Sequence, residues 1–328
     1  MPEGGNNPIY ALVLFATLLS ACNSNDGDSL DSEKKDEPTQ TVLDTDSDSD
    51  NNTDNETDNN PPPQIDWSVL TPQASDITDL ILVTGQSNVR GSNTGFDPTI
   101  DTPDKQSFVF NSNGQWGVAD LHNAWDGNWA PGNGSLQDET RQPHNNFVFH
   151  FGKVVAESDS SRVIGYVVVS APGKGISHWD RNRDFFYHVR DVALAAINTQ
   201  GVKSEFDAVL WHQGETDWLT MGTSDPEISG DERRYPNYYR EKLASLIADF
   251  RGQSWINDNA YFICGETAHA PVNQVLMELN NDSDPRTGCV TSAGLTTLTI
   301  DEVPVHFDAP GLRELGKRYA ELYLRMTE

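Results

Sequence analysis

Apolar, β-branched runs alternate with amphipathic segments along most of this chain, from residue 79 to residue 326. Strand-like runs cover 79–85, 107–110, 162–173, 206–212 and 259–267, and segments with helical spacing cover 146–158, 184–201, 235–252 and 309–326. The run at 162–173 is almost continuously apolar, as expected of a strand buried on both faces of a parallel sheet. The alternation predicts an α/β fold with a doubly wound, mostly parallel sheet and helices on both faces.

Four of the predicted strands run directly into polar, glycine-containing loops. The loop sequences are TGQSN (84–88), SAPGKGISHWD (170–180), HQGETD (212–217) and CGETAH (264–269). In doubly wound folds the ligand lies beyond the carboxyl ends of the strands, where such loops meet. The functional site is therefore expected in these loops.

The chain contains the groups that covalent ester hydrolysis requires, namely a nucleophile, a base and donors for the oxyanion. Ser87 follows a strand and precedes a loop, which suits a nucleophile but equally suits a serine that caps a turn. The G-x-S-x-G elbow of α/β-hydrolases is absent, because Val89 stands at the second glycine. His306 lies in a short extended segment before the last helix, where a base can reach the sheet edge. The backbone N–H of Gly175 and the side-chain amide of Gln213 are candidate oxyanion donors.

Taken together, four segments resemble the SGNH-type, GDSL-like hydrolases. They are GQSN (85–88), KGISHW (174–179), WHQGETD (211–217) and HFDAPGLRELGKRYA (306–320), and they occur in the order expected of that superfamily. The closer resemblance is to the branch of sialate O-acetylesterases and acetylxylan esterases, carbohydrate esterase family 6 and its relatives, from about Leu80 to Tyr323. It implies a three-layer α/β/α sandwich that needs no metal and no cofactor and removes acetyl groups from a carbohydrate substrate.

By this resemblance Ser87 is the nucleophile, and its own backbone N–H is one oxyanion donor. Gly175 and Gln213 are the other donors, and His306 is the general base. Trp179 either stacks on a sugar ring or is a core tryptophan that anchors its loop. Further residues are expected to brace the loops or to contact substrate, namely Gln86, Asn88, Glu215 and Asp217.

One position departs from the family pattern. The aspartate that orients the catalytic histidine usually lies three residues before it, and that position is Val303 here. Asp301 and Glu302 lie slightly further upstream, so a bulge or a longer loop would bring one of them to the His306 ring, with Asp301 preferred. Otherwise a backbone carbonyl serves and the machinery is a dyad. Loss of an orienting acid can cost about 10⁴ in rate.

The N-terminal region is expected to lie outside the fold. Residues 1–22 are predicted to be a lipoprotein signal peptide, because a short apolar run ends in Leu-Ser-Ala-Cys, although no Lys or Arg precedes it. Cys22 would carry the lipid, which predicts export to the cell envelope or secretion. Residues 23–64 are predicted to be a disordered acidic tether, because they contain thirteen acids, two lysines and few core-forming residues. Residues 65–328 would form the esterase domain.

Charge and cysteine content limit the partners. The chain has a formal net charge of −28, of which about −16 belongs to residues 65–328. A domain this acidic argues against nucleic acid, whose phosphates require Lys and Arg. The lipid anchor is the one expected membrane contact, and a monomer is expected. Cys264 and Cys289 could form a disulfide in an exported protein, but their spacing does not decide whether they do, and there is no zinc-type cysteine cluster.

Two alternatives to a carbohydrate acetylesterase stay open at this stage. The valine at the usual aspartate position would also fit a glycan-binding surface lipoprotein that kept the fold and lost the chemistry. An esterase for short acyl esters of other alcohols would need the same machinery.

Overall fold

The computed structural model describes residues 73–91, 95–121, 128–129, 145–219, 236–268, 272–281, 284–298 and 305–328. All of them belong to one unit, Trp67–Glu328. The predicted signal peptide with Cys22 and the acidic tether lie outside the described residues, and so do Asp301, Glu302 and Val303. The boundaries of the N-terminal segments and the lipidation therefore stay predictions. Within the described part, no helix combines the length and the apolar character needed to cross a membrane.

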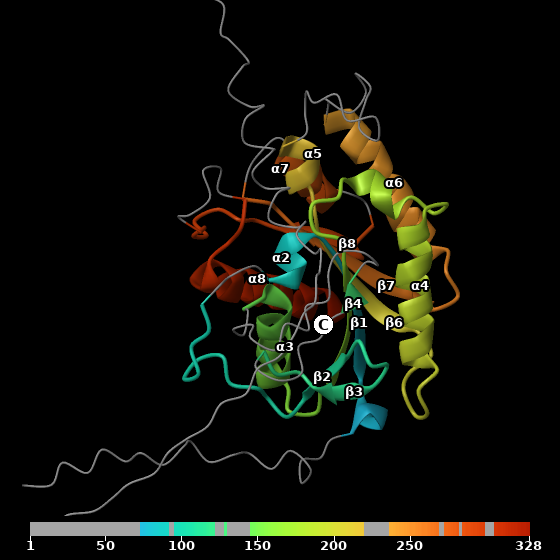
Figure 1. The fold of residues 1–328 in the computed structure, drawn as a ribbon, viewed down its shortest axis with the longest axis vertical. Helices are drawn as coiled ribbons and strands as arrows, with labels where there is room; N and C mark the ends of the chain where they lie inside the picture. The colour runs from blue at the N-terminus through green and yellow to red at the C-terminus, as the bar shows by residue number, and fades with distance from the viewer. Residues whose placement is uncertain are drawn as a thin grey trace, which may run out of the picture. The chain divides into compact units, whose positions relative to one another are not determined.

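An eight-stranded sheet forms the centre of the described part (Figure 1). It consists of β1 (Asp79–Gly85), β2 (Ser107–Phe110), β3 (Trp116–Val118), β4 (Asn128–Trp129), β5 (Ile164–Ser170), β6 (Phe206–His212), β7 (Ile256–Gly265) and β8 (Thr287–Val290). The strand order is β3-β2-β5-β1-β6-β7-β8, with β4 also paired to β5. All pairings are parallel except that of β2 with β3.

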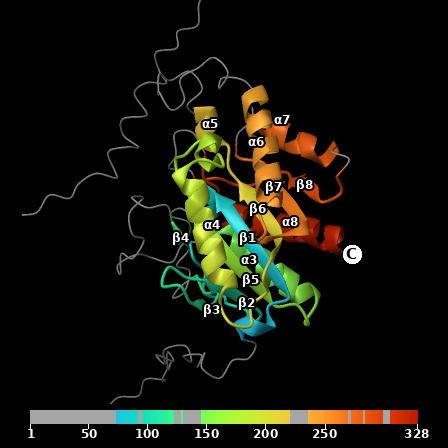
Figure 2. The same cartoon turned by 90° about the vertical axis from the view of Figure 1, so that its right-hand side faces the viewer.

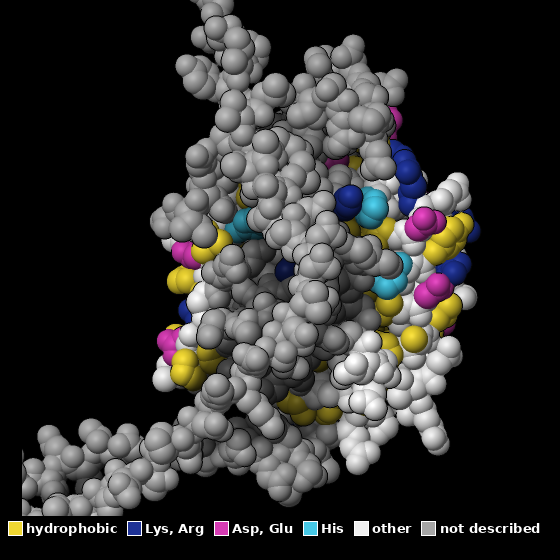
Figure 3. All heavy atoms as spheres, in the orientation of Figure 1, with side chains coloured by type: hydrophobic (Ala, Val, Ile, Leu, Met, Phe, Trp, Pro, Cys, Tyr) yellow, Lys and Arg dark blue, Asp and Glu magenta, His cyan; other side chains and the backbone are white. Residues whose placement is uncertain are grey.

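Helices cover both faces of this sheet, which confirms the predicted three-layer α/β/α sandwich. The α-helices are α2 (Ser87–Arg90), α3 (Phe147–Ser158), α4 (Asp184–Ile197), α5 (Glu215–Leu219), α6 (Pro236–Arg251), α7 (Val272–Glu278) and α8 (Ala309–Thr327), and short 3₁₀ turns are η3 (Ala74–Asp76), η4 (Ile176–Trp179) and η6 (Leu279–Asn281). The side chains of α4, α6 and α7 pack in one apolar cluster, and those of α2, α3 and α8 pack in the other. The ribbons of α4 and α3 lie on opposite sides of the sheet (Figures 1 and 2). On the face seen in Figure 3, acidic and basic side chains are interspersed along the edge where α4 lies.

The two covered faces explain why the strands read as continuous apolar runs. Successive side chains of a strand point to opposite faces of the sheet. In β1, Leu80 and Leu82 pack on the side of α4 and α6, whereas Ile81 and Val83 pack on the side of α3 and α8. All four are fully buried, so both alternating sets must be apolar.

The long elements match the segments expected from sequence, whereas several short ones were missed. The missed elements are β3, β4, β8, α2, α5 and α7, of two to seven residues each. Such segments are too short for a periodic pattern to appear, and their conformation depends on pairing or packing with distant parts of the chain. The consequence at the site is that Ser87 opens the short helix α2 instead of standing in an irregular loop.

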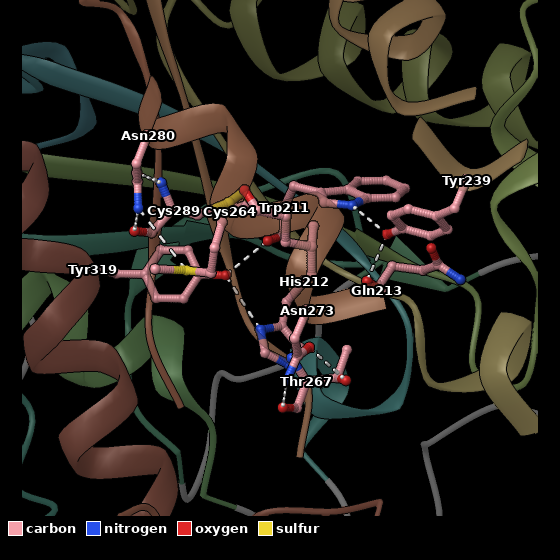
Figure 4. Close-up of a disulfide and its surroundings, with 12 residues drawn as sticks. Trp211, His212, Gln213, Tyr239, Cys264, Thr267, Asn273, Asn280, Cys289 and Tyr319 are labelled. Atoms are coloured by element: carbon pink, nitrogen blue, oxygen red, sulfur yellow. Dashed lines mark hydrogen bonds between the residues drawn. A yellow bond between two sulfur atoms is a disulfide. The ribbon is translucent and has the colours of Figure 1, made fainter. Parts of the chain in front are cut away.

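Cys264 and Cys289 form a disulfide between β7 and β8 (Figure 4). The two residues are register partners on neighbouring parallel strands, with their Cα atoms 4.4 Å apart. Both side chains are buried. The pairing that their spacing left open is thus decided by the register of the two strands.

Removal of this disulfide is expected to destabilise the fold. The bond closes a loop with a sequence separation of 25 residues, for which the chain-entropy model gives about 3 kcal/mol. The Cys264→Ala/Cys289→Ala double variant should therefore unfold at lower urea concentration than the wild type. A reductant should lower the wild-type midpoint to a similar extent and leave the variant's midpoint unchanged. A wild-type midpoint that does not respond to reductant under unfolding conditions would contradict this prediction.

Candidate active site

The site lies at the carboxyl end of β1, in the middle of the sheet. Strands β2 to β5 lie on one side of β1, and β6 to β8 lie on the other. The order of the strands therefore reverses at β1, and such a switch point is where doubly wound folds bind their ligands. Gly85, the last residue of β1, is in register with Ser170 on β5 and His212 on β6. The loops that follow these three aligned ends carry Ser87, Gly175 and Gln213.

Gly85 allows the chain to turn sharply into the site. Its φ is +150°, and a Cβ atom there would lie 2.0 Å from the carbonyl oxygen of His212. No other residue fits without displacing the β6 backbone. The turn leads directly into α2, where the N–H of Val89 donates to the carbonyl of Gln86 at 3.0 Å. As a result Ser87 is partly exposed, although it stands between two buried residues.

The structure brings Ser87 and His306 into hydrogen-bond contact. The distance between His306 Nε2 and Ser87 Oγ is 2.9 Å, although the residues are 219 positions apart. His306 lies in an extended segment that pairs with the chain at Thr297, and the N–H of Leu298 donates to the His306 carbonyl at 2.9 Å. A hydroxyl held against an imidazole in this way has the geometry of a serine nucleophile and its general base.

Gln213 links the loops that follow β1 and β5. Its buried Nε2 donates to the carbonyl of Lys174 at 3.1 Å, to Gln86 Oε1 at 3.2 Å and to a carboxylate oxygen of Asp217. A side-chain amide has only two N–H donors, so these three acceptors compete for them. Gln86 Oε1 also accepts from the backbone N–H groups of Gly214 and Thr216, each at 3.4 Å. One N–H of Gln213 can therefore be transferred to a new acceptor while the other keeps the side chain in place.

Asp217 joins Gln213 to the loop that contains Gly175. Its carboxylate accepts from the backbone N–H of Ile176 at 3.0 and 3.1 Å, in addition to Gln213. A Cβ atom on Gly175 would lie only 3.2 Å from this carboxylate. Burial raises the pKa of Asp217 to about 6, against the opposing effect of the hydrogen bonds from Gln213 and Ile176. Asp217 thus bonds both to the candidate oxyanion donor Gln213 and to the backbone next to the other candidate, Gly175. Bracing these loops is one of the two roles expected for Asp217.

Replacement of Asp217 by Asn is expected to change how stability depends on pH. Because the pKa of Asp217 is about 6 in the folded protein and near 3.8 otherwise, protonation contributes stability that is complete below the lower value and lost as pH rises through the higher one. Between about pH 5 and pH 7.5, the free energy of unfolding of the wild type should fall by roughly 1 kcal/mol more than that of Asp217→Asn. Urea denaturation at both pH values measures the difference. Parallel pH profiles of the two proteins would contradict the prediction.

Asn88 and Glu215 form a buried pair behind Ser87. Asn88 Nδ2 donates to Glu215 Oε1 at 2.6 Å. His212 Nε2 lies 3.5 Å from the same carboxylate oxygen. Burial raises the pKa of Glu215, but the hydrogen bond and charge of His212, together with hydrogen bonds from the Glu215 backbone and Asn88, outweigh burial and leave that pKa below its ordinary value. Glu215 is therefore a carboxylate at neutral pH.

His212 was missed as a site residue by the sequence reasoning. It is fully buried at the end of β6, and its Nδ1 lies 3.2 Å from the hydroxyl of Tyr319 on α8 (Figure 4). The available signal was its position, since it directly precedes Gln213 at the carboxyl end of a predicted strand.

The structure excludes one of the two roles considered for Trp179, that of a stacking platform for a sugar ring. Its side chain is fully buried, and its Nε1 donates to the hydroxyl of Thr84 at 2.9 Å. The ring packs edge-on against Phe185 and Trp211 in the core. Burial leaves no ring face for a sugar, so Trp179 anchors its loop instead of forming a stacking platform.

Which residue orients the His306 ring stays a prediction. Asp301, Glu302 and Val303 lie outside them. Within the described part of the chain, no three His, Cys, Asp or Glu side chains are grouped so as to hold a metal ion.

Fold and site together define a doubly wound α/β protein with a serine and a histidine in contact at the carboxyl edge of a mostly parallel sheet. The model of the family described as carbohydrate esterase, sialic acid-specific acetylesterase, matches residues 77–325, about three quarters of the chain. The chain belongs to this family of carbohydrate esterases. It is accordingly a hydrolase of ester bonds, an acetylesterase whose substrate is a carbohydrate.

Solved structures share the fold at low sequence identity. A protein from Arabidopsis thaliana is 18% identical with a TM-score of 0.57, and the match covers 75% of this chain and 98% of that one. NanS is 16% identical with a TM-score of 0.54, and the match covers 77% of this chain and 98% of NanS. No curated protein sequence matches this chain significantly.

Proposed function

We propose that this protein is a serine O-acetylesterase that removes acetyl groups from poly- or oligosaccharides through an acetyl-enzyme on Ser87. The observation that carries the proposal is the 2.9 Å contact between Ser87 Oγ and His306 Nε2 at the switch point of the sheet. Membership of the carbohydrate esterase family supports the acetylated sugar as substrate.

The proposed reaction has two halves. Ser87 Oγ attacks the acetyl carbonyl carbon while His306 Nε2 accepts the hydroxyl proton, and the oxyanion is stabilised by the N–H groups of Ser87 and Gly175 and by the Gln213 amide. His306 then returns the proton to the departing sugar oxygen. In the second half, water gives a proton to His306 and attacks the acetyl-enzyme, which releases acetate and restores Ser87.

The proposal can be compared with two other functions. A glycan-binding protein without activity would not need a serine and a histidine in direct contact, and no observation in the described residues favours it. An esterase for other alcohols would use the same residues, so the substrate must be tested directly.

The test is acetate release from a panel of acetylated polysaccharides and sialic acids, with p-nitrophenyl esters of increasing chain length beside them. We expect hydrolysis of p-nitrophenyl acetate, a sharp fall beyond short acyl groups, and acetate release from at least one glycan. Saccharide binding without acetate release from any substrate would overturn the proposal. Activity on simple acetyl esters alone would overturn the carbohydrate part of it.

We also propose that the protein acts outside the cytoplasm, attached through a lipid on Cys22. The support is the sequence of residues 1–22 and the acidic tether that follows. The buried Cys264–Cys289 disulfide suits an oxidising compartment.

A further inference from the structure

We propose that Asn88 is a positioning residue that holds His306 against Ser87 by clamping the backbone on both sides of the histidine. The inference deepens the proposed serine mechanism and rests on it. It assigns to Asn88 a role in aligning the base, beyond bracing its own loop.

The clamp consists of two hydrogen bonds from one side chain. Asn88 Nδ2 donates to the carbonyl of Val305 at 2.9 Å, and the N–H of Phe307 donates to Asn88 Oδ1 at 3.2 Å. The two bonded residues flank His306 directly. Because Asn88 follows Ser87 in α2, a single buried amide ties the helix of the nucleophile to the segment of the base.

The orientation of the Asn88 amide is determined by its partners. Its second Nδ2 hydrogen is donated to Glu215 Oε1 at 2.6 Å. If oxygen and nitrogen were exchanged, the oxygen would face the Val305 carbonyl and the Glu215 carboxylate, and the nitrogen would face the Phe307 N–H. Every contact would then be repulsive, so only one orientation satisfies all three partners. The amide is only 1% exposed, which excludes water as a substitute.

Glu215 lies next to a buried histidine of β6, which in turn contacts α8. The Tyr319 hydroxyl donates to the carbonyl of Trp211 at 2.7 Å, so it accepts from His212 Nδ1 at 3.2 Å. The opposite nitrogen of the His212 ring then faces Glu215 Oε1 at 3.5 Å. The Glu215 carboxylate therefore lies beside a buried group of side chains, of which Tyr319, His212 and Trp211 are seen in Figure 4.

The mechanical consequence concerns the distance between base and nucleophile. The backbone of His306 is held at its own carbonyl by Leu298 and on both flanks by Asn88. These backbone bonds do not fix the rotation of the His306 ring, which an acid or a carbonyl bonded to Nδ1 would restrict. Misplacement of a catalytic group by about 1 Å can cost about 10² in rate, so loss of the clamp should appear in kcat and not in substrate binding.

A purely structural role for Asn88 would have a different signature, and the chain offers a matched control. Asn280 makes a comparable pair of side-chain bonds to a single residue, Cys289: its Nδ2 donates to the Cys289 carbonyl at 3.0 Å, and the Cys289 N–H donates to its Oδ1 at 2.7 Å. These bonds join the turn η6 to the edge strand β8 and involve neither Ser87 nor His306. Asn280→Ala should lower Tm and leave kcat unchanged.

The experiment compares Asn88→Ala and Asn88→Asp with Asn280→Ala in the full chain, using p-nitrophenyl acetate and the rate of Ser87 modification by a sulfonyl fluoride. Asn88→Asp keeps the bond to Phe307 but sets a carboxylate against Glu215 and the Val305 carbonyl. We expect both Asn88 variants to lose about 10² in kcat, with KM within roughly threefold and sulfonylation slowed in proportion. Glu215→Gln keeps an acceptor for Asn88 and should lose less.

The result that overturns the inference is kcat within roughly threefold of wild type in a folded Asn88→Asp or Asn88→Ala protein. A larger loss in Glu215→Gln than in Asn88→Asp would also overturn it, because the charge of Glu215 and not the clamp would then be responsible. Ser87→Ala separates this from the underlying mechanism. If Ser87→Ala is inactive while the Asn88 variants are fully active, only the clamp fails; if Ser87→Ala is active, the serine mechanism itself fails.

Discussion

Ser87→Ala is expected to lose about 10⁴ or more in kcat/KM for an acetyl ester. The variant lacks the atom that forms the proposed acetyl-enzyme, so the remaining candidate oxyanion donors can assist only a direct attack by water. Because Ser87 is partly exposed at the start of a short helix, removal of its hydroxyl should leave the fold intact. Initial rates with p-nitrophenyl acetate measure the loss, and mass spectrometry after rapid acid quench should detect an added acetyl group on the wild type alone.

The histidine provides the internal control for this prediction. His306→Ala removes the proposed base, which contacts Ser87 Oγ at 2.9 Å, and its loss of activity should approach that of Ser87→Ala. The double variant should be no worse than the Ser87 variant, because residues of one catalytic unit act non-additively. Additive losses, or an acetyl group found on another residue, would contradict a Ser87–His306 unit.

Gln213→Ala is expected to lower kcat by about 10² to 10³, the usual effect of removing one oxyanion donor. The reason is that the two hydrogens of Gln213 Nε2 are shared among three acceptors. One of them can therefore be donated to the oxyanion as its negative charge develops. KM should change little, because this donor interacts more strongly with the transition state than with the substrate.

A second glutamine serves as the matched control for Gln213. Gln253 also donates its side-chain amide to a backbone carbonyl, that of Asp249 at 2.8 Å, but at the end of α6. Gln253→Ala should keep wild-type kinetics. If Gln213→Ala raises KM with unchanged kcat, then Gln213 binds the substrate in its ground state and is not an oxyanion donor.

Much of the fold could be predicted because its signals are local. Strands buried on both faces are apolar at nearly every position, and the glycine that ends β1 is required by a φ of +150° beside the His212 carbonyl. Ser87, Gln213 and His306 were predicted as site residues because each lies next to an element that sequence periodicity reveals and because the segments around them resemble the SGNH-type hydrolases. Their order along the chain, together with the strand rule for doubly wound sheets, placed three of the loops at one edge.

Other features of the site depend on contacts that no local pattern contains. From the sequence, the aromatic ring of Trp179 fits a stacking platform for a sugar as well as it fits the core. Only its burial against Trp211 and Phe185 shows that it is a core residue. His212 is one of eight histidines in the sequence, and only the approach of Glu215 and Tyr319 gives it a part in the site.

By itself, then, the amino-acid sequence determined the class of fold, the edge of the sheet at which the candidate site lies and the residues on either side of Ser87. Periodic burial and backbone sterics act over a few residues, so a sequence can express them directly. Only the tertiary structure decided that Cys264 meets Cys289 and that the amide of Asn88 reaches both sides of His306. Those contacts join positions far apart in the chain, and they exist because strand register and helix packing set distances to within an ångström.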